Sequence, residues 1–503
     1  MTGIQQPWTK WLTLGVMLTG LWLLSACAPF PLARIEPQNR IELEDCLLGA
    51  PGMTHQQRGR CGMLPVPEDR SRPDGRQINL NIAVIPAAIQ NKEPDPLFLL
   101  AGGPGQAASE VFIPLLPIFD AINFRRDLVL IDQRGAGRSN PLTCPELADT
   151  EVQRVGEDLP VEDQQAHLEA CLAALDADTR FYTTPAAAAD LDDVRQALGY
   201  EQINLLGVSY GTRLAQVYLH LYPDRVRTMV LNGVVPQGWA IGGASMAADA
   251  ERALGIIFER CQADPACNLA FPDLKDHFRE WLARLDENPA AITIEHPLTG
   301  KSTEVWVTRY LVSATVRLMT YSSDYVALLP YLIYTAAVDG DYQPLIAQYF
   351  IALEPASGGI NSGLFLSVLC SEDVPFYPSD MNGAGYFFQP PMESFRSFCE
   401  IWPHEIIDPL LRQPVQSNVP TLLLSGEADP VTPPVNADRV AAYLPNSLNL
   451  VAPGLGHDVI HQGCVPRIIY QFIDRGEVDS LSVDCVRQLL PFPFFTSPLG
   501  PQP

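Results

Sequence analysis

A Gly-x-Ser-x-Gly string at residues 207–211 constrains the fold of this chain more than any other feature. Residues 203–206, just before it, form a short apolar run typical of a buried strand, and residues 214–218 carry apolar side chains at helical spacing. A strand that passes directly into a helix needs a very sharp turn, in which only very small side chains fit two residues either side of the centre. We therefore expect Ser209 at the carboxyl edge of a sheet, immediately before a helix.

Short apolar strands alternate with helices in two stretches of the chain, residues 76–236 and 415–503. Such alternation predicts an α/β fold with a mostly parallel sheet and helices on both faces. Residues 237–414 have a different rhythm, with four amphipathic helical patterns and Gly-rich loops, and we expect them to form an inserted helical cap. The expected strands are 77–85, 96–100, 127–131, 203–206, 226–231, 421–424 and 448–451, and the expected cap helices are 247–260, 274–285, 309–319 and 325–337.

A serine hydroxyl is a poor nucleophile unless a base removes its proton, so a catalytic Ser209 needs a histidine and an acid. In a fold of this kind these follow later strands, in the order Ser, acid, His. Asp429 follows the 421–424 strand and His457 follows the last strand, so we predict a triad of Ser209, Asp429 and His457. The alternatives that the sequence leaves open are Glu427 and Asp458 for the acid and His461 for the base.

A second Gly-rich element, residues 101–105, follows the 96–100 strand. Acyl transfer creates an oxyanion that needs preorganised N–H donors. We expect one donor from Tyr210, the residue after the nucleophile, and the other from Gly103. A phosphate-binding loop is the competing interpretation, but neither GxGxxG nor GxxxxGK[ST] is present. The predicted chemistry requires no cofactor and no metal.

Four motifs in this order resemble the family of prolyl iminopeptidases and tripeptidyl aminopeptidases, which have the α/β-hydrolase fold. They are Gly102-Gly103-Pro104-Gly105, Asp132-Gln133-Arg134-Gly135-x-Gly137-x-Ser139, Gly207-x-Ser209-Tyr210-Gly211 and Asp429-x-x-Thr432-Pro433. The resemblance spans about residues 76–475. It implies an exopeptidase that acts on peptides from their free amino terminus, with a cap that closes over the site and sets substrate length. It also implies that Asp132 and Arg134 are structural supports.

The sequence departs from the prolyl iminopeptidases at Ala101, where they usually have histidine, and its Cys-rich cap looks more like the secreted tripeptidyl aminopeptidases. An aminopeptidase must hold a cationic amino group, which a carboxylate can bind. We predict this role for Glu372, with Asp373 as the alternative. A carboxylester hydrolase of the same fold and a non-catalytic surface lipoprotein remain alternative functions.

The N-terminus is typical of an exported lipoprotein. Lys10 precedes a 14-residue run, residues 11–24, which is too short for a membrane span but fits a signal peptide. The run ends in Leu24-Ser25-Ala26-Cys27, which resembles a lipobox, so we expect cleavage of residues 1–26 and lipid on Cys27. Residues 27–75 then form a tether and lead-in. Ala28, after the cysteine, favours the outer membrane, with the protein facing the periplasm or cell surface.

The remaining ten cysteines fall as near neighbours, which suggests five local disulfides and an oxidising compartment. The hypothetical pairs are Cys46–Cys61, Cys144–Cys171, Cys261–Cys267, Cys370–Cys399 and Cys464–Cys485. A metal site is the weaker interpretation, because no CxxC or Cys/His cluster has ligand spacing. The formal net charge of −25 excludes nucleic acid as a partner, because phosphates need a basic surface.

Overall fold

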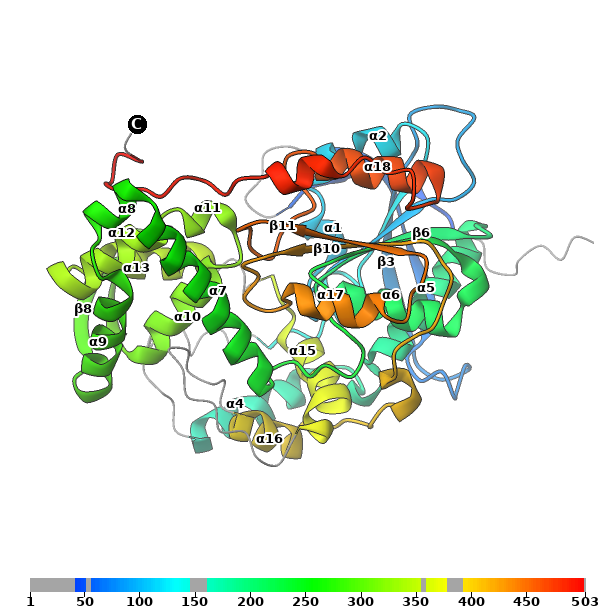
Figure 1. The fold of residues 1–503 in the computed structure, drawn as a ribbon. Coiled ribbons are helices and arrows are strands. Elements are labelled where there is room, and N and C mark those ends of the chain that lie inside the picture. The colour runs from blue at the N-terminus through cyan, green and yellow to red at the C-terminus, as the bar shows by residue number, and fades with distance from the viewer. Residues whose placement is uncertain (1–40, 51–55, 145–160, 354–358, 378–391, 502–503) are drawn as a thin grey trace, which may run out of the picture. The chain divides into compact units, whose positions relative to one another are not determined.

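The computed structural model describes residues 41–50, 56–144, 161–353, 359–377 and 392–501, and its centre is a nine-stranded sheet (Figure 1). The strand order is β1-β2-β3-β5-β4-β6-β7-β10-β11. The six strands from β5 to β11 run parallel to one another, whereas β1, β2 and β3 join the sheet by antiparallel pairing. The strands are β1 Glu44–Leu48, β2 Gln57–Pro67, β3 Gln77–Ile85, β4 Leu97–Leu100, β5 Leu128–Ile131, β6 Ile203–Val208, β7 Val226–Asn232, β10 Thr421–Gly426 and β11 Ser447–Ala452. The predicted mostly parallel sheet is confirmed.

Two strands lie where the sequence predicted only a lead-in, within residues 27–75. β2 pairs with β3 from Arg60, opposite Val84, to Pro67, opposite Gln77, and β1 pairs with β2 at the edge of the sheet. Two prolines and two glycines in β2 weaken the strand pattern, because proline cannot donate to the ladder. The structure therefore corrects the start of the sheet from about residue 76 to residue 44.

Helices cover both faces of the sheet, as expected for parallel strands that are buried on both sides. Below the sheet in Figure 1 lie α5 Thr184–Leu198, α6 Tyr210–Leu221 and α17 Pro434–Ala441, whose apolar side chains share one core cluster with the strands. Above it lie α1 Ala108–Val111, α2 Asp120–Asn123 and α18 Val465–Arg475, which belong to a second cluster. Neighbours along β6 alternate between the clusters: Leu205 faces the first and Leu206 the second.

The insertion between β7 and β10 begins with a helical lobe that has its own apolar core. The lobe contains α7 Ala244–Ala263, α8 Pro265–Ala270, α9 Leu274–Glu287, α10 Arg309–Met319, α11 Ser323–Val326, α12 Leu329–Tyr334 and α13 Gln343–Gln348. It also contains an antiparallel hairpin that the sequence analysis missed, β8 Ala290–Glu295 and β9 Ser302–Val307. The helix predicted over 325–337 is instead broken, because Pro330 fits only the first turn of α12.

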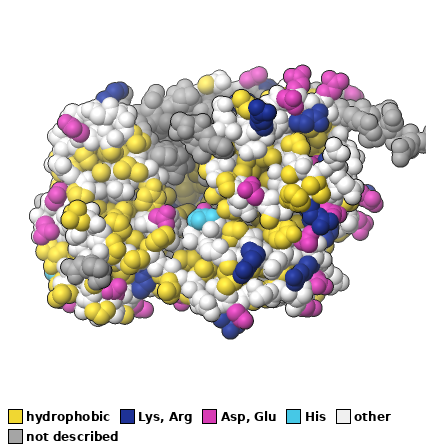
Figure 2. Space-filling view, turned by 90° about the horizontal axis from the view of Figure 1, so that it is seen from above, with side chains coloured by type: hydrophobic (Ala, Val, Ile, Leu, Met, Phe, Trp, Pro, Cys, Tyr) yellow, Lys and Arg dark blue, Asp and Glu magenta, His cyan; other side chains and the backbone are white. Residues whose placement is uncertain are grey.

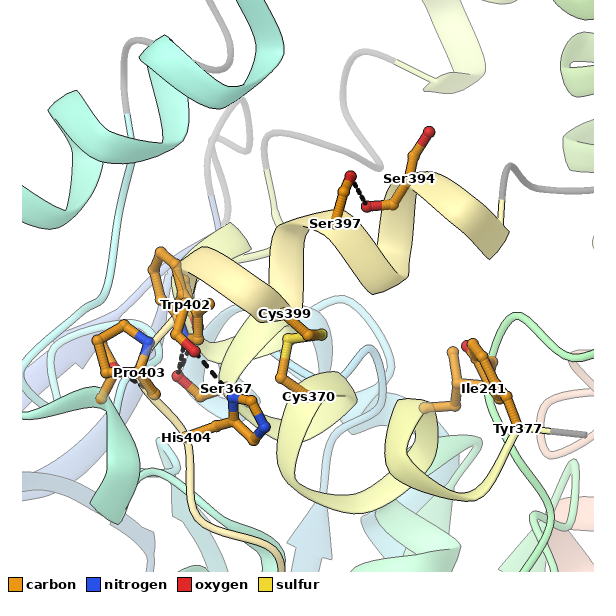
Figure 3. Close-up of a disulfide and its surroundings, with 12 residues drawn as sticks. Ile241, Ser367, Cys370, Tyr377, Ser394, Ser397, Cys399, Trp402, Pro403 and His404 are labelled. Atoms are coloured by element: carbon orange, nitrogen blue, oxygen red, sulfur yellow. Dashed lines mark hydrogen bonds between the residues drawn. A yellow bond between two sulfur atoms is a disulfide. The ribbon is translucent and has the colours of Figure 1, made fainter. Parts of the chain in front are cut away.

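The second part of the insertion packs against a helix from the first stretch of the chain. α15 Ser362–Val368 continues into the helical turn Leu369–Asp373, and α16 Met392–Ile401 contacts α4 Val161–Ala174. In Figure 3 the Cys370–Cys399 disulfide joins that turn to α16, and the Trp402 indole donates to Ser367 Oγ at 3.0 Å. This disulfide and the buried Cys144–Cys171 pair belong to one apolar cluster.

All five disulfides have the pairing that the sequence analysis suggested. Beyond α18 the chain forms a short 3-10 helix, Asp484–Gln488, and the segment from Pro491 is irregular, as expected. This segment ends against the cap, where Phe494 is buried and the Phe495 amide donates to the Ala327 carbonyl at 2.9 Å. No helix of the described residues is both long and apolar enough to cross a membrane. The predicted signal peptide and Cys27 lie outside the described residues.

Candidate active site

Ser209 lies at the sharp turn between β6 and α6, with φ 56° and ψ −124°. This strained backbone conformation persists because the surrounding structure holds the turn in place. A Cβ at Gly207 would lie 2.5 Å from the Gly211 carbonyl oxygen, and one at Gly211 would lie 2.2 Å from the Leu100 carbonyl oxygen. Both glycines are therefore required by close backbone approach, and the predicted turn is confirmed.

His457 and Asp429 form a buried hydrogen-bonded pair at the carboxyl edge of the sheet. The carboxylate Oδ2 of Asp429, in the loop after β10, lies 2.8 Å from Nδ1 of His457, in the loop after β11. Burial lowers the pKa of His457, but the Asp429 carboxylate more than offsets this, so the net pKa is raised. Burial raises the pKa of Asp429, but His457 and the Thr432 donors hold it below its usual range. The pair is thus arranged to stabilise a protonated imidazole.

The alternative acids and base lie elsewhere. The Glu427 carboxylate accepts a hydrogen bond from the Gly454 amide at 2.8 Å. Asp458 instead forms a partly exposed pair with His461, with 3.3 Å between Oδ2 and Nδ1. Of the acidic candidates named from the sequence, only Asp429 is hydrogen-bonded to His457.

Thr432 is a member of this site whose role the sequence analysis missed. Its hydroxyl donates to Asp429 Oδ2 at 2.7 Å and lies 3.0 Å from His457 Nδ1, and its amide donates to Asp429 Oδ1 at 2.9 Å. The Val431 amide donates to the same Oδ1 at 2.9 Å. These three donors fix the carboxylate so that it faces the imidazole. The available signal was the Asp-x-x-Thr spacing, which lets a turn fold back on its own carboxylate.

The end of β7 connects the serine to the histidine. The Ser209 amide donates to the Asn232 carbonyl at 2.9 Å, and the Asn232 side-chain amide donates to the His457 carbonyl at 3.3 Å. Gly233 comes next, with φ +63°, and a Cβ there would lie 2.6 Å from His457 Cε1. Gly233 therefore leaves the space that the imidazole ring occupies, and the sequence analysis did not identify it.

The loop that begins at Ala101 lies beside the nucleophile. A Cβ at Gly102 would lie 3.0 Å from the Ser209 Cβ, so the backbone of this loop closely approaches the serine. Gly103 has φ +102°, which side chains rarely adopt, and the Gln133 side chain donates to the Ala101 carbonyl at 3.2 Å. Tyr210 is the first residue of α6, where the amide has no partner within the helix. The two predicted donors, Gly103 and Tyr210, thus belong to elements that flank Ser209.

Asp132 and Arg134 are buried beneath this region, as the resemblance implied. Asp132 accepts hydrogen bonds from the Asn81 side chain at 2.8 Å and from the Ser109 amide at 2.9 Å. Arg134 forms a two-pronged ion pair with Asp190, with both distances 2.7 Å. Neither side chain has spare accessible groups for substrate, because both are fully buried.

The cap reaches the histidine through Tyr321. The His457 amide donates to the Tyr321 carbonyl at 2.9 Å, and the two rings meet edge to face with centroids 5.2 Å apart. Tyr321 also packs against a small apolar cluster of Val235, Trp239 and Val431. The loop that holds His457 is therefore supported from both the sheet and the cap.

Glu372 and Asp373 do not lie where a substrate could reach them, which corrects the prediction that they bind an amino group. Glu372 is 1% exposed; its carboxylate accepts from the Thr184 amide at 2.6 Å and from the Thr184 hydroxyl at 2.7 Å. Asp373 is fully buried and forms a two-pronged pair with Arg213, at 3.1 Å for both contacts. The cavity beside Glu372 measures about 10 Å³, room for a single water molecule.

These carboxylates instead stabilise the region below the nucleophile. The Thr184 hydroxyl donates to Glu372, so it accepts from the Tyr210 phenol, 2.7 Å away. Arg213 is one turn after Ser209 on α6 and lies 3.5 Å from Glu372. The sequence could not separate this arrangement from an accessible site, because both place carboxylates in a disulfide-bonded segment.

Figure 2 shows the molecule from above relative to Figure 1, from the side on which α2 and α18 lie, and this face is hollowed near its middle. A histidine side chain is visible in the hollow, and hydrophobic side chains cover much of the surface to either side. Such a partly apolar hollow beside hydrogen-bonding groups is typical of a site for a small organic ligand.

Comparison with known proteins agrees with this geometry. Residues 95–260 match the model of the alpha/beta hydrolase fold, and residues 386–485 match the TAP-like protein family. The chain is 32% identical to tripeptidyl aminopeptidase of Streptomyces lividans over 196 residues, which cover 35% of each protein. It is 26% identical to serine protease Hip1 of Mycobacterium tuberculosis over 477 residues, covering 84% of this chain and 87% of that protein.

A third relative is a probable proline iminopeptidase of Streptomyces coelicolor, 32% identical over 186 residues, covering 37% of this chain and 45% of the relative. The matches to the tripeptidyl aminopeptidase and the iminopeptidase thus span less than half of those proteins, whereas the match to Hip1 spans most of it. The chain belongs to the family of α/β-hydrolase peptidases that includes the tripeptidyl aminopeptidases and the proline iminopeptidases.

Proposed function

We propose that this protein is a serine aminopeptidase that cleaves short peptides from their free amino terminus, with Ser209, His457 and Asp429 as its catalytic triad. The observation that carries the proposal is the buried Asp429–His457 pair, at 2.8 Å, at the same carboxyl edge of the sheet as the strained Ser209. Relatives named as tripeptidyl aminopeptidase, proline iminopeptidase and serine protease support a peptidase over other uses of the fold.

In this mechanism His457 removes the Ser209 hydroxyl proton as the oxygen attacks the scissile carbonyl. Asp429 holds the imidazole tautomer and stabilises the imidazolium that forms. The amides of Gly103 and Tyr210 stabilise the oxyanion, and His457 then donates its proton to the leaving amine. Water then attacks the carbonyl of the acyl-enzyme while His457 accepts its proton, and His457 returns a proton to Ser209 as the acyl product leaves. A lost oxyanion donor typically lowers turnover by roughly 100- to 1,000-fold.

We assign the recognition of the substrate amino group to Asp249 on α7. Its side chain is half-buried, and no described residue forms an ion pair or hydrogen bond with it. Met246, one turn earlier, packs with Tyr321 in the apolar cluster, and Arg252, one turn later, donates to the Asp429 carbonyl at 2.9 Å. This stripe of α7 therefore faces the loop that holds Asp429. Asp249 on it has no ion pair among the described residues, although the charges of Arg252 and Arg439 are near enough to act on its pKa.

The proposal is tested with chromogenic amides of Pro, Ala and Ala-Ala-Pro, an acetylated Ala-Ala-Pro amide and a short acyl ester. Release from the free tripeptide but not from its acetylated form supports a tripeptidyl aminopeptidase, and D249N should then raise KM about 10-fold or more. Hydrolysis of the ester alone withdraws the peptidase proposal in favour of a carboxylester hydrolase. S209A is the inactive control, and no activity with any substrate favours a binding protein.

We also propose that the mature protein is attached through lipid on Cys27 to a bacterial membrane, and that Ala28 directs it to the outer one. The apolar run before Leu24-Ser25-Ala26-Cys27 supports this, and the five disulfides of the described residues are consistent with an exported protein. Growth with labelled palmitate should label the wild-type protein but not C27A. Equal labelling of both would contradict the proposal.

A further inference from the structure

Arg317, in the last turn of α10, has no acidic partner among the described residues, although the protein has 58 acidic and 33 basic residues. Its Nη2 donates to the Tyr321 phenol oxygen at 3.3 Å, and its guanidinium carbon lies 5.8 Å from the centre of that ring. Within the described part of the chain no carboxylate lies at ion-pair distance from it. The side chain is half-buried, and its other N–H groups remain accessible to solvent.

The position of Arg317 connects it to the catalytic base. The Tyr321 ring contacts the guanidinium and also meets the His457 ring edge to face, with centroids 5.2 Å apart. Burial lowers the pKa of His457, Asp429 raises it, and the nearby charge of Arg317 lowers it. The guanidinium is thus close enough to His457 to affect its protonation.

In the proposed function His457 protonates the leaving amine, so the leaving part of the peptide departs past this histidine. A group of the cap beside His457 therefore meets the leaving part, and a guanidinium with free N–H groups suits a carboxylate. We propose that Arg317 binds a carboxylate on the leaving part of the peptide, which determines specificity. That carboxylate is either the C-terminal group of a short leaving fragment or an acidic side chain next to the cleaved bond.

A purely structural role is the simpler alternative, because arginine in the last turn of a helix often stabilises its terminal carbonyls. Here Thr320 meets part of that need: its amide donates to the Val316 carbonyl at 3.2 Å, and its hydroxyl donates to the Arg317 carbonyl at 2.6 Å. The guanidinium donates to a phenol instead. A structural role would affect all substrates equally, and this difference makes the proposal testable.

The test compares kcat/KM for three peptides with the same acyl part: Ala-Ala-Pro-Ala with a free C-terminus, the same peptide as an amide, and Ala-Ala-Pro-Glu amide. The wild-type enzyme should prefer at least one carboxylate peptide over the neutral amide by about 10-fold. R317A should bring that ratio close to one, and R317K should give an intermediate ratio, because lysine keeps the charge but loses the fork. R284A, which removes a cap arginine bound to the Ala337 carbonyl, should keep the wild-type ratio.

The two carboxylate peptides distinguish the sources: preference for the free C-terminus identifies a terminal carboxylate, and preference for the glutamate amide identifies a side chain. A wild-type ratio near one, or an R317A variant that keeps the wild-type ratio, overturns the assignment. Failure of the proposed function would be a separate result. The wild-type enzyme would then release no chromophore from the chromogenic Ala-Ala-Pro amide.

Discussion

Replacing Gly233 with alanine should disable the catalytic base while leaving the protein folded. The residue has φ +63°, and the new Cβ would lie 2.6 Å from His457 Cε1 and 3.0 Å from Nδ1. Carbon atoms in contact normally stay about 3.5–4.0 Å apart, so the imidazole must move by about 1 Å. A misplacement of that size in a catalytic group costs about 100-fold in rate. We therefore expect G233A to lower kcat/KM about 100-fold.

Gly199 provides a matched control, because it has φ +80° at the end of α5 and a Cβ there would meet nothing within 4 Å. Both substitutions place alanine in a left-handed conformation, which costs about 1–2 kcal/mol of unfolding free energy. Only G233A adds the collision with His457.

The assay measures hydrolysis of Ala-Ala-Pro chromogenic amide together with urea unfolding of wild type, G199A and G233A. The expected result is a similar small loss of stability in both variants and a large loss of activity in G233A alone. Wild-type activity in folded G233A, or equal losses of activity in the two variants, would refute the role that we give to this glycine.

Three further predictions concern other parts of the site. T432V should lower kcat by about 10- to 100-fold, because it removes a hydrogen bond to an ionised carboxylate, and T432S should restore most of it; steady-state kinetics decide. Burial raises the pKa of Asp249 to about 6, so this carboxylate becomes neutral in acid; the wild-type to D249N ratio of kcat/KM for a free-amine peptide should fall toward one from pH 8 to pH 5. The C370A/C399A double variant removes a disulfide between cysteines 29 residues apart, so its free energy of unfolding should be about 2–4 kcal/mol lower; urea titration measures this.

The sequence was sufficient for the parts of this protein in which local pattern and tertiary structure agree. One parallel sheet explains the apolar strands, the glycines around Ser209 and the order of Asp429 and His457 along the chain. The sequence therefore predicted both where these strands end and which catalytic side chains follow them. The cap helix over 309–319 was also predictable, because its apolar face repeats at helical spacing.

The parts that were not predicted depend on contacts between distant segments. Glu372 has the sequence context of an accessible loop carboxylate, but Thr184 and Arg213, far away in the chain, bury and satisfy it. Tyr321 and Gly233 support His457 from segments that carry no motif of their own. Strand β2 was not predicted because its prolines interrupt the strand pattern of the sequence. Its pairing with β3 stabilises the strand in the structure.

Labelling with a fluorophosphonate shows whether Ser209 is an activated nucleophile. The serine oxygen attacks phosphorus and fluoride leaves, so we expect one phosphonyl adduct per molecule, on the peptide that contains Ser209. S209A should show no adduct, and G233A should react much more slowly than G199A. If the folded wild-type protein gains no adduct, or gains it on another residue, Ser209 is not the nucleophile.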